Sequence, residues 1–563
     1  MSHSMNNTRR WSKLLSSHLA WITIVLLCMA LFLPGLFQVP VTDVDEARFA
    51  QASKQMVETQ DYWHINIQNK PRHLKPPAIY WLQSFITQST QSAPYNQIFS
   101  YRLPSFFAAT TTTLLIFLLY AASLGRKTAF IASVVFASTL IVAFESSFST
   151  TDACLMLSIF VMQWALGQIY LNHRKDRPNH ARWPVLFWGS MAVGIFLKGI
   201  APIFAIGTIV ALCLFDRQWR WTRALHPALG LLGVLLLTLS WLIPFSLASH
   251  SNFLWDMISQ DVVHKVTGGQ EGHGQPMGFY LLLMPLLFWP MSLYFTTAFN
   301  YAKQQWQNPT TRFLLAWILP NWLIYELIPT KLIHYLMPIF PAIALLIAIS
   351  LLSPLSQSSQ RKARYFEACL WFFCNVVLAL GVAFFPYSLT HQISFAALAA
   401  SLIILINMLM AYRYFRQQHH LASLTCNALT AIIVYTLLFS ITFPNLTLLW
   451  NSQRVAKLLQ LPNYQEQIAD HPLLVSGYHE PSLIFEVGTQ SVAFTPLDTI
   501  EKSYASNTGS LALLGKKDFQ RFQTFAQQHD FHFKVDAILP GYNLNHGKHI
   551  ILRLIEPLDK EST

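Results

Sequence analysis

The sequence predicts an α-helical polytopic membrane protein that carries a small C-terminal α/β domain. Two observations predict the membrane part: 53% of the 563 residues are hydrophobic, and only 11% are charged. Soluble domains carry about a quarter charged residues, whereas a bilayer removes the need for a polar surface. A third observation predicts the C-terminal domain, because the composition becomes mixed and charged after Phe443.

About thirteen apolar segments approach the length of roughly 20 residues that one bilayer crossing requires. The fifth and sixth are short and are separated only by Lys198-Gly199, so the number of crossings could differ by one or two. The first segment lacks a small-residue cleavage site and is expected to be an uncleaved anchor. The expected segments are 17–38, 102–122, 128–145, 151–171, 183–198, 200–215, 226–248, 279–299, 311–328, 333–353, 366–386, 392–412 and 424–442.

The distribution of charge predicts the orientation of these segments. With a cytoplasmic N-terminus, every predicted inner loop contains Lys or Arg, which accumulate on the cytoplasmic side of membrane proteins. An odd number of crossings then places the C-terminal domain on the periplasmic side. Most carboxylates before residue 443 fall on this outer face, which suggests that the chemistry takes place there. The net charge of +12 is spread between the spans, so membrane lipids are expected partners and nucleic acid is not.

Two outer loops are long, at about 39–101 and 250–278. The first contains an amphipathic stretch, 46–57, which is expected to be a helix on the membrane surface, and the glycines of the second predict mobility. We therefore divide the chain into a membrane domain, 1–445, and a periplasmic α/β domain, 446–563, which we expect to pack against the outer loops. Within the latter, strand-like runs cover 473–476, 491–494, 534–539 and 549–554, and a helix-like run covers 517–528.

The first candidate motif, Asp43-x-Asp45-Glu46-Ala47-Arg48, follows the first span at the outer surface. A carboxylate at the mouth of a membrane cavity suits a general base, so Asp45 and Glu46 are candidate catalytic residues. The structural alternative is a solvated helix N-terminus, where the helix dipole favours Asp and Glu.

The second motif places Lys70, Arg72 and Lys75 outside the membrane, beside Tyr80-Trp81 and against the charge trend of the loops. Cations suit a lipid-linked phosphate and aromatic rings suit the membrane interface, so Arg72 and Lys75 are candidate phosphate-binding residues. Simple attraction to lipid headgroups explains the same pattern equally well.

Two further motifs open predicted spans on the outer side. Asp152 is either a helix cap or a catalytic acid, because ionisable residues at membrane depth are costly and mark functional sites. Lys331 and Tyr335 suit phosphate binding, and their structural alternative is a snorkelling lysine and an interfacial tyrosine. Weaker candidates are Tyr80, Lys198, Asp261, His264 and Lys265. The six cysteines lie in apolar segments and the histidines are scattered, so no metal site and no cofactor are predicted.

Together these motifs resemble the bacterial lipid A aminoarabinose transferases, relatives of the protein O-mannosyltransferases among the GT-C glycosyltransferases. The resemblance is carried over the whole membrane part by the following segments: Asp45-Glu46-Ala47-Arg48-Phe49-Ala50, Lys75-Pro76-Pro77, Tyr80-Trp81, Asp152, Lys198-Gly199 and Lys331-x-x-x-Tyr335-x-x-Pro338. Two positions depart from the family pattern: Phe49 stands where Tyr is common, and Lys265 where Arg is frequent. Both departures leave the identity of the sugar open.

The resemblance implies a GT-C fold and a glycosyltransferase of the bacterial inner membrane. The implied donor is an undecaprenyl-phosphate sugar, typically 4-amino-4-deoxy-L-arabinose, and the implied acceptor is lipid A at the periplasmic face. Asp45 would match the key carboxylate of the family and Asp152 a second acidic residue, while Arg48, Lys75 and Tyr335 would surround the donor phosphate. A cationic sugar would weaken the binding of cationic peptides such as polymyxin to lipopolysaccharide.

Two other functions fit parts of the pattern. A protein O-glycosyltransferase that uses a polyprenyl-phosphate sugar shares the first acidic motif and the membrane architecture. A lipid transporter would explain the many spans, but the sequence lacks paired halves with interrupted helices. The polar groups also gather at one face and not at the bilayer midplane.

Overall fold

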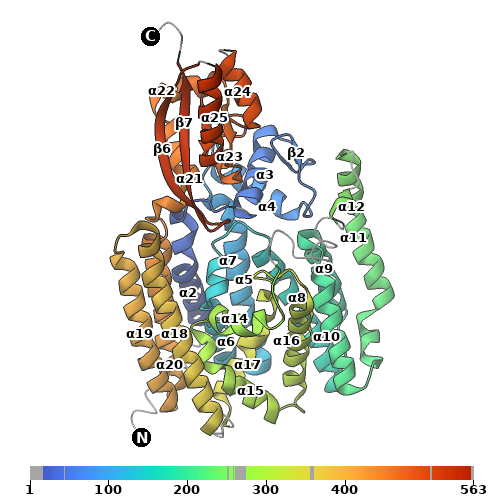
Figure 1. The fold of residues 1–563 in the computed structure, drawn as a ribbon. Helices are drawn as coiled ribbons and strands as arrows, with labels where there is room; N and C mark the ends of the chain where they lie inside the picture. Colours follow the sequence, from blue (N-terminus) through green and yellow to red (C-terminus); the bar gives the residue numbers. More distant parts are fainter. Residues whose placement is uncertain are drawn as a thin grey trace.

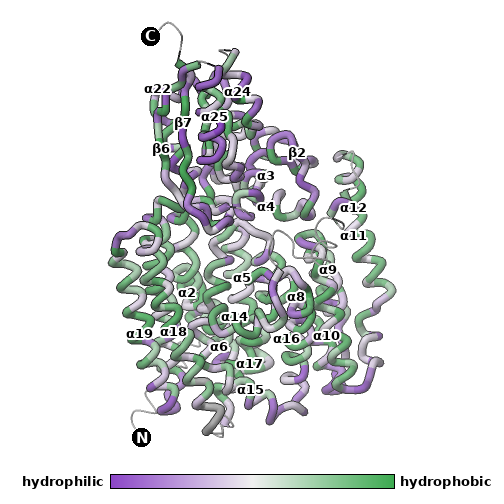
Figure 2. The backbone as a smooth tube through the Cα atoms, in the orientation of Figure 1, coloured by the Kyte–Doolittle hydropathy of each residue, from purple (hydrophilic) through white to green (hydrophobic). Residues whose placement is uncertain are grey.

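The computed structural model describes residues 17–43, 45–249, 253–257, 259, 274–354, 361–506, 510–529 and 531–558. The candidates Asp261, His264 and Lys265, with most of the second long outer loop, lie outside the described residues. A bundle of long helices fills the lower part of the molecule, and a smaller segment with a sheet lies above it (Figure 1). Hydrophobic residues dominate the bundle and hydrophilic residues the upper segment (Figure 2), which fits a membrane-embedded part and an aqueous part.

Helices occupy all of the expected apolar segments, so the helical polytopic class is confirmed. Among the described residues, seven helices are long and apolar enough to cross a membrane, or eight if one bent pair is a single span. The number thirteen therefore stays a prediction. The helices are α2 Ser17–Gln38, α5 Phe99–Leu124, α6 Arg126–Ala137, α7 Leu140–Glu145, α8 Asp152–Arg174, α9 Arg182–Lys198, α10 Ala201–Asp216, α11 Pro227–Ala248, α12 Phe253–Met257, α14 Phe279–Leu287, α15 Phe295–Gln304, α16 Pro309–Leu327, α17 Phe340–Leu352, α18 Arg361–Thr390, α19 Phe395–Arg416 and α20 His420–Thr436, with short helical turns at Arg220–Leu225, Met291–Tyr294, Met337–Ile339 and Leu437–Thr442.

Two expected spans are interrupted, and their breaks meet inside the bundle. The segment 128–145 divides between α6 and α7, and the segment 279–299 bends by 111° after α14. At the meeting point the Leu140 amide donates to the Trp289 carbonyl at 2.8 Å, and the Tyr435 hydroxyl donates to the Ser138 and Trp289 carbonyls. These bonds satisfy backbone groups that an unbroken helix would satisfy itself, which is how broken helices are tolerated at membrane depth.

Above the bundle, the first outer loop folds into α3 Asp45–Thr59, the short hairpin β1 Asn66–Ile67 and β2 Lys70–Pro71, and α4 Ala78–Thr90. The predicted helix at 46–57 is thus confirmed, while its expected position on the membrane surface stays a prediction. Side chains on nearly all sides of α3 are buried, including the polar Gln51 and Lys54. The reason is that α4 packs on one side of it and the C-terminal segment packs on the other.

The C-terminal segment is built on a five-stranded mixed sheet of order β4-β3-β5-β7-β6. Four of its strands and its last helix coincide with the runs that the sequence predicts. The strand β5 was missed, because all four of its residues are buried and a central strand shows no alternation. The elements are α21 Asn451–Leu459, α22 Pro462–Asp470, β3 Leu473–Ser476, α23 Pro481–Val487, β4 Val492–Phe494, α24 Leu497–Ala505, β5 Ala512–Gly515, α25 Lys516–His529, β6 Phe533–Asn543 and β7 Lys548–Pro557, after a short turn at Thr447–Leu449.

The C-terminal segment rests on the first outer loop, mainly through α23 on α3. The buried ammonium of Lys54 donates to the Phe485 carbonyl at 2.8 Å. The Gln51 amide donates to Thr489 at 2.8 Å, and the Ser482 amide donates to Asp43 at 3.1 Å. The expected packing against this loop is therefore present, while the domain boundary at residues 445 and 446 stays a prediction.

Candidate active site

A cavity of about 450 Å³ opens where the membrane bundle meets the outer loop, a volume within the range of ligand sites. Its walls come from the N-terminus of α3, the link from β2 to α4, the link from α7 to α8, the end of α9, the start of α14 with Gln275 before it, and the link from α16 to α17. The structure brings nine of the predicted site residues together here: Asp45, Glu46, Arg48, Arg72, Lys75, Asp152, Lys198, Lys331 and Tyr335. The tenth described candidate, Tyr80, lies behind this wall.

The cations from the first outer loop form one side of the cavity. Arg48 lies 3.9 Å from Asp45, one turn away on α3. The guanidinium of Arg72 stacks over the Phe49 ring at 5.5 Å and donates to the Tyr80 hydroxyl at 3.3 Å. Tyr80 is completely buried, so it holds Arg72 in place without reaching the cavity. Planar guanidinium groups fixed in this way suit the oxygens of a phosphate.

Lys331 is partly committed to the protein itself. Its ammonium is buried and donates to the Gln275 and Ile328 carbonyls at 2.9 and 2.8 Å. An ammonium carries three donors, so one remains beyond these two bonds. Lys331 therefore ties the segment after α16 to Gln275, and its role in phosphate binding stays a prediction.

The cavity also contains a compact charged group that we call the acidic cluster: Glu145, Asp152, Lys198 and His334. The Lys198 ammonium donates to one oxygen of Asp152 at 2.6 Å and lies 5.1 Å above the ring of Tyr335. His334 lies between the two carboxylates, with Nδ1 3.1 Å from Glu145 and Nε2 3.6 Å from Asp152. Asp152 is the first residue of α8, where the helix dipole favours a negative charge.

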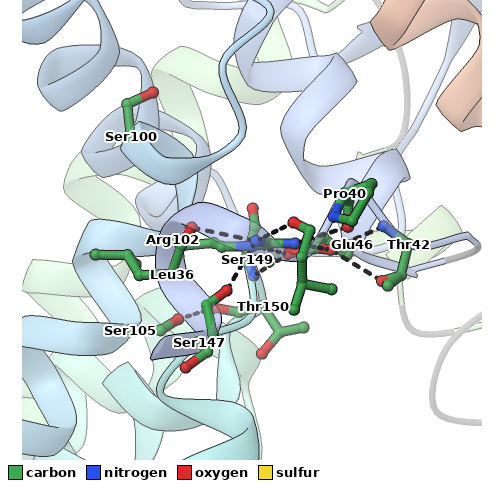
Figure 3. Close-up of polar contacts among 12 residues, drawn as sticks. Leu36, Pro40, Thr42, Glu46, Ser100, Arg102, Ser105, Ser147, Ser149 and Thr150 are labelled. Atoms are coloured by element: carbon green, nitrogen blue, oxygen red, sulfur yellow. Dashed lines mark hydrogen bonds and ion pairs between the residues drawn. The ribbon is translucent and has the colours of Figure 1, made fainter. Parts of the chain in front are cut away.

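Glu46 is a member of the cavity wall, but its carboxylate is fully engaged below the surface (Figure 3). One oxygen accepts from the Arg102 guanidinium at 2.7 Å and from the Ser149 amide at 3.0 Å. The other accepts from Arg102 and from the amide and hydroxyl of Thr42, all at 2.9 Å. Both side chains of the ion pair are at most 1% exposed. These contacts favour a structural role for Glu46 over the catalytic role that the sequence suggested.

Glu145, Asp152 and His334 also have the donor types of a metal site, with ligand atoms within 4.8 Å of one another. Those atoms are already contacted, Asp152 by Lys198 and Glu145 by the Thr150 hydroxyl at 3.0 Å. A metal ion held by a His334 nitrogen in this place would have to replace the contact of that nitrogen with Glu145 or Asp152.

Three residues in or beside this site were not among the sequence candidates: Glu145, His334 and Arg102. Glu145 interrupts an apolar segment, and an ionisable residue at membrane depth is itself a signal. His334 lies inside the motif of Lys331 and Tyr335, but a single histidine in a sequence does not reveal its partners. Arg102 begins an apolar span, where it resembles an ordinary flanking cation.

Comparisons with known proteins agree with this geometry. Residues 74–243 match a family described as dolichyl-phosphate-mannose-protein mannosyltransferase. The chain is 26% identical over 393 residues to the undecaprenyl phosphate-alpha-4-amino-4-deoxy-L-arabinose arabinosyl transferase of Aeromonas hydrophila, covering 66% of this chain and 68% of the relative. It is 27% identical over 329 residues to the enzyme of the same name from Pseudomonas savastanoi pv. phaseolicola, covering 57% of this chain and 59% of the relative.

Solved structures show the same fold over nearly the whole chain. The crystal structure of ArnT from Cupriavidus metallidurans bound to undecaprenyl phosphate matches with a TM-score of 0.72 at 16% identity, covering 95% of this chain and 97% of ArnT. The apo form of that protein matches with a TM-score of 0.70 at 15% identity, covering 97% of this chain and 98% of ArnT.

The chain therefore has the multi-pass helical fold of the ArnT structures, and the family and relatives that it matches in sequence are described as glycosyltransferases. The similarity to enzymes named as aminoarabinose transferases confirms the resemblance seen in the sequence. The transporter alternative loses its support, because the relatives are transferases and the polar groups enclose a cavity at one face.

Proposed function

We propose that this protein transfers 4-amino-4-deoxy-L-arabinose, or a related amino sugar, from undecaprenyl phosphate to lipid A. The observation that carries the proposal is one cavity, at the edge of the membrane bundle, that is lined by both cations and carboxylates. A lipid-linked phosphate needs the cations, and a transfer reaction needs acid–base groups within reach of the same substrate. The donor and the sugar follow the names of the relatives.

In the proposed reaction, an oxygen of the acceptor attacks the anomeric carbon of the sugar. The bond from that carbon to the undecaprenyl phosphate oxygen breaks, and the departing phosphate takes the electron pair. Arg48, Arg72 and Lys75 neutralise the charge that develops on it. Asp45, whose side chain is 55% exposed, accepts any proton that the acceptor oxygen releases. Asp152, held by Lys198, faces the sugar from the start of α8.

We place the enzyme in the bacterial inner membrane, with the cavity and residues 446–563 on the periplasmic side. The basic inner loops support this orientation. The upper hydrophilic segment supports it as well, because it lies on the same side of the bundle as the cavity (Figures 1 and 2).

The test compares lipid A by mass spectrometry from cells with the protein, without it, and with Asp45→Asn. We expect one pentosamine mass per modified phosphate, and a loss of roughly 100-fold or more in the variant, the size of a missing general base. Control cells carry Arg521→Ala, which removes an exposed ion pair far from the cavity. A different added mass would show that another sugar is transferred. Unmodified lipid A in all strains would show that lipid A is not the acceptor.

A second candidate is a protein O-glycosyltransferase, which the matched mannosyltransferase family favours. Here the acceptor would be a Ser or Thr hydroxyl of a periplasmic protein. Unchanged lipid A together with glycopeptides that depend on Asp45 would select this candidate over the first.

A further inference from the structure

The acidic cluster contains two groups, Glu145 and His334, for which the transfer reaction described above has no use. Their side chains are 4% and 14% exposed, at the bottom of the cavity wall. Burying an ionisable group is costly unless it is paired, so their presence in a membrane-embedded wall needs an explanation.

We propose that His334 is a positioning residue that acts as an imidazolium, with Glu145 holding it against Asp152. The inference rests on the proposed function, because it assigns Asp152 to the sugar. Lys198 donates to one oxygen of Asp152, while the other oxygen lies 3.6 Å from His334 Nε2 and accepts from the Thr151 hydroxyl at 3.4 Å, so a charged ring would limit rotation of the carboxylate.

The geometry specifies the charge of the ring. Both ring nitrogens face carboxylate oxygens, which are acceptors when ionised. A neutral imidazole has one N–H and can satisfy only one of these neighbours, whereas the imidazolium donates from both nitrogens. With the ring protonated, the cluster holds two negative and two positive charges. Loss of that proton would leave an uncompensated buried negative charge and free Asp152 on one side.

The charged groups near the ring come from several elements, and the two carboxylates favour its protonation whereas Lys198 opposes it. Glu145 comes from the end of α7, Asp152 from the start of α8 and Lys198 from the end of α9. The ring of Tyr335 lies edge-on at 5.3 Å from its own segment. The charge of Lys75 also reaches Asp152 from the first outer loop. Two carboxylates thus face His334 directly, while Lys198 and Lys75 interact first with Asp152.

The first experiment measures transfer to lipid A as a function of pH, using enzyme in lipid nanodiscs with the undecaprenyl-phosphate sugar. In wild type, kcat should fall on the alkaline side as the imidazolium loses its proton. His334→Asn should lower kcat on the order of 100-fold with little change in KM and remove that alkaline limb, since misplacing a reacting group is costly. Glu145→Gln should shift the alkaline decrease in kcat to lower pH. Glu145→Asp, which keeps the carboxylate, should return this decrease part of the way to its wild-type pH.

The control is His64→Asn, which removes another histidine paired with a carboxylate, 2.7 Å from Asp61, outside the cavity. Its pH profile should match wild type. A purely structural role for His334 would lower the yield of folded protein without altering the shape of the pH profile. An unchanged alkaline limb in folded His334→Asn enzyme would overturn the proposal.

A second measurement does not depend on activity. The difference between NMR spectra of ¹⁵N-histidine-labelled wild type and His334→Asn isolates the signals of His334. Two protonated nitrogens at pH 7, and a neutral ring at the same pH in Glu145→Gln, would support the proposal. A neutral His334 in wild type would overturn it. If the ring is charged but no sugar moves to lipid A, the proposed function fails and the electrostatic assignment stands.

Discussion

At the scale of single residues, the structure separates groups that face the cavity from groups that build it. Asp45 and Glu46 are neighbours in the sequence, yet one side chain is 55% exposed and the other is 1% exposed. The difference arises because Arg102 reaches Glu46 from the start of α5 and also donates to four carbonyls, those of Gly35, Leu36, Val39 and Pro40. This ion pair joins the end of α2 to α3 and α5, and so places Asp45 at the cavity.

We expect Glu46→Gln to destabilise the protein by about 3–5 kcal/mol, because removing one partner leaves a buried charge unpaired. Thermal unfolding of the purified protein measures this loss. The matched control is Asp498→Asn, whose partner Arg521 lies 2.9 Å away with both side chains more than 60% exposed; its cost should be at most about 1 kcal/mol. Equal effects of the two substitutions would contradict a structural role for Glu46.

At the scale of elements, α3 is the part on which both the cavity and the C-terminal segment depend. Its first turn supplies Asp45 and Arg48 to the cavity, and its opposite side carries α23. Directly before it, Asp43 lies in the contact with the C-terminal segment, near the charge of Glu480. Burial, followed by that charge, raises the pKa of Asp43 to about 7. A perturbed carboxyl in this place makes the contact sensitive to pH.

The sign of that dependence follows from the raised pKa. The protonated form of Asp43 is favoured in the folded state, so its contribution to stability is complete below about pH 4 and is lost as the pH rises through about 7. We expect the melting temperature to decrease between pH 5 and 8, and Asp43→Asn to raise it at pH 8, since an amide keeps the acceptor for Ser482 without a charge. Scanning fluorimetry at each pH measures the melting temperature. If Asp43→Asn melts at a lower temperature than wild type at pH 8, the proposed effect of the Asp43 charge is wrong.

At the scale of the whole molecule, apolar side chains on the bundle surface face the lipid. Leu380 on α18 is 64% exposed, and Ile538 on strand β6 of the C-terminal segment is 59% exposed. The two exposed side chains therefore differ in their expected surroundings: we expect Leu380 to contact hydrocarbon and Ile538 to contact water.

We expect Leu380→Arg to oppose membrane insertion by about 2.5–3.5 kcal/mol, the cost of a cation at the centre of a spanning helix. Ile538→Arg should change stability by no more than about 0.5 kcal/mol, as surface substitutions in water usually do. The amount of protein in the membrane fraction measures both. Loss of membrane-inserted protein in the second variant but not in the first would reverse our assignment of the two surfaces.

Much of this protein follows from its sequence alone. Hydrophobic segments of bilayer length predict the helices, because lipid offers no other solution for the backbone. Basic inner loops and acidic outer motifs predict one chemical face, and the motifs beginning at Asp45, Lys75, Asp152 and Lys331 all meet at the cavity. Composition also predicts the C-terminal sheet, with the exception of a buried strand that lacks alternation.

Only the tertiary structure decides what each of those side chains does. Periodicity and spacing describe neighbours along one helix, whereas Arg102 reaches Glu46 across 56 positions, and Glu145 and His334 come together from distant connections. An acidic residue at a helix start looks the same whether it faces a cavity or a buried guanidinium. The energy that distinguishes the two cases is desolvation and pairing in three dimensions, which no local pattern records.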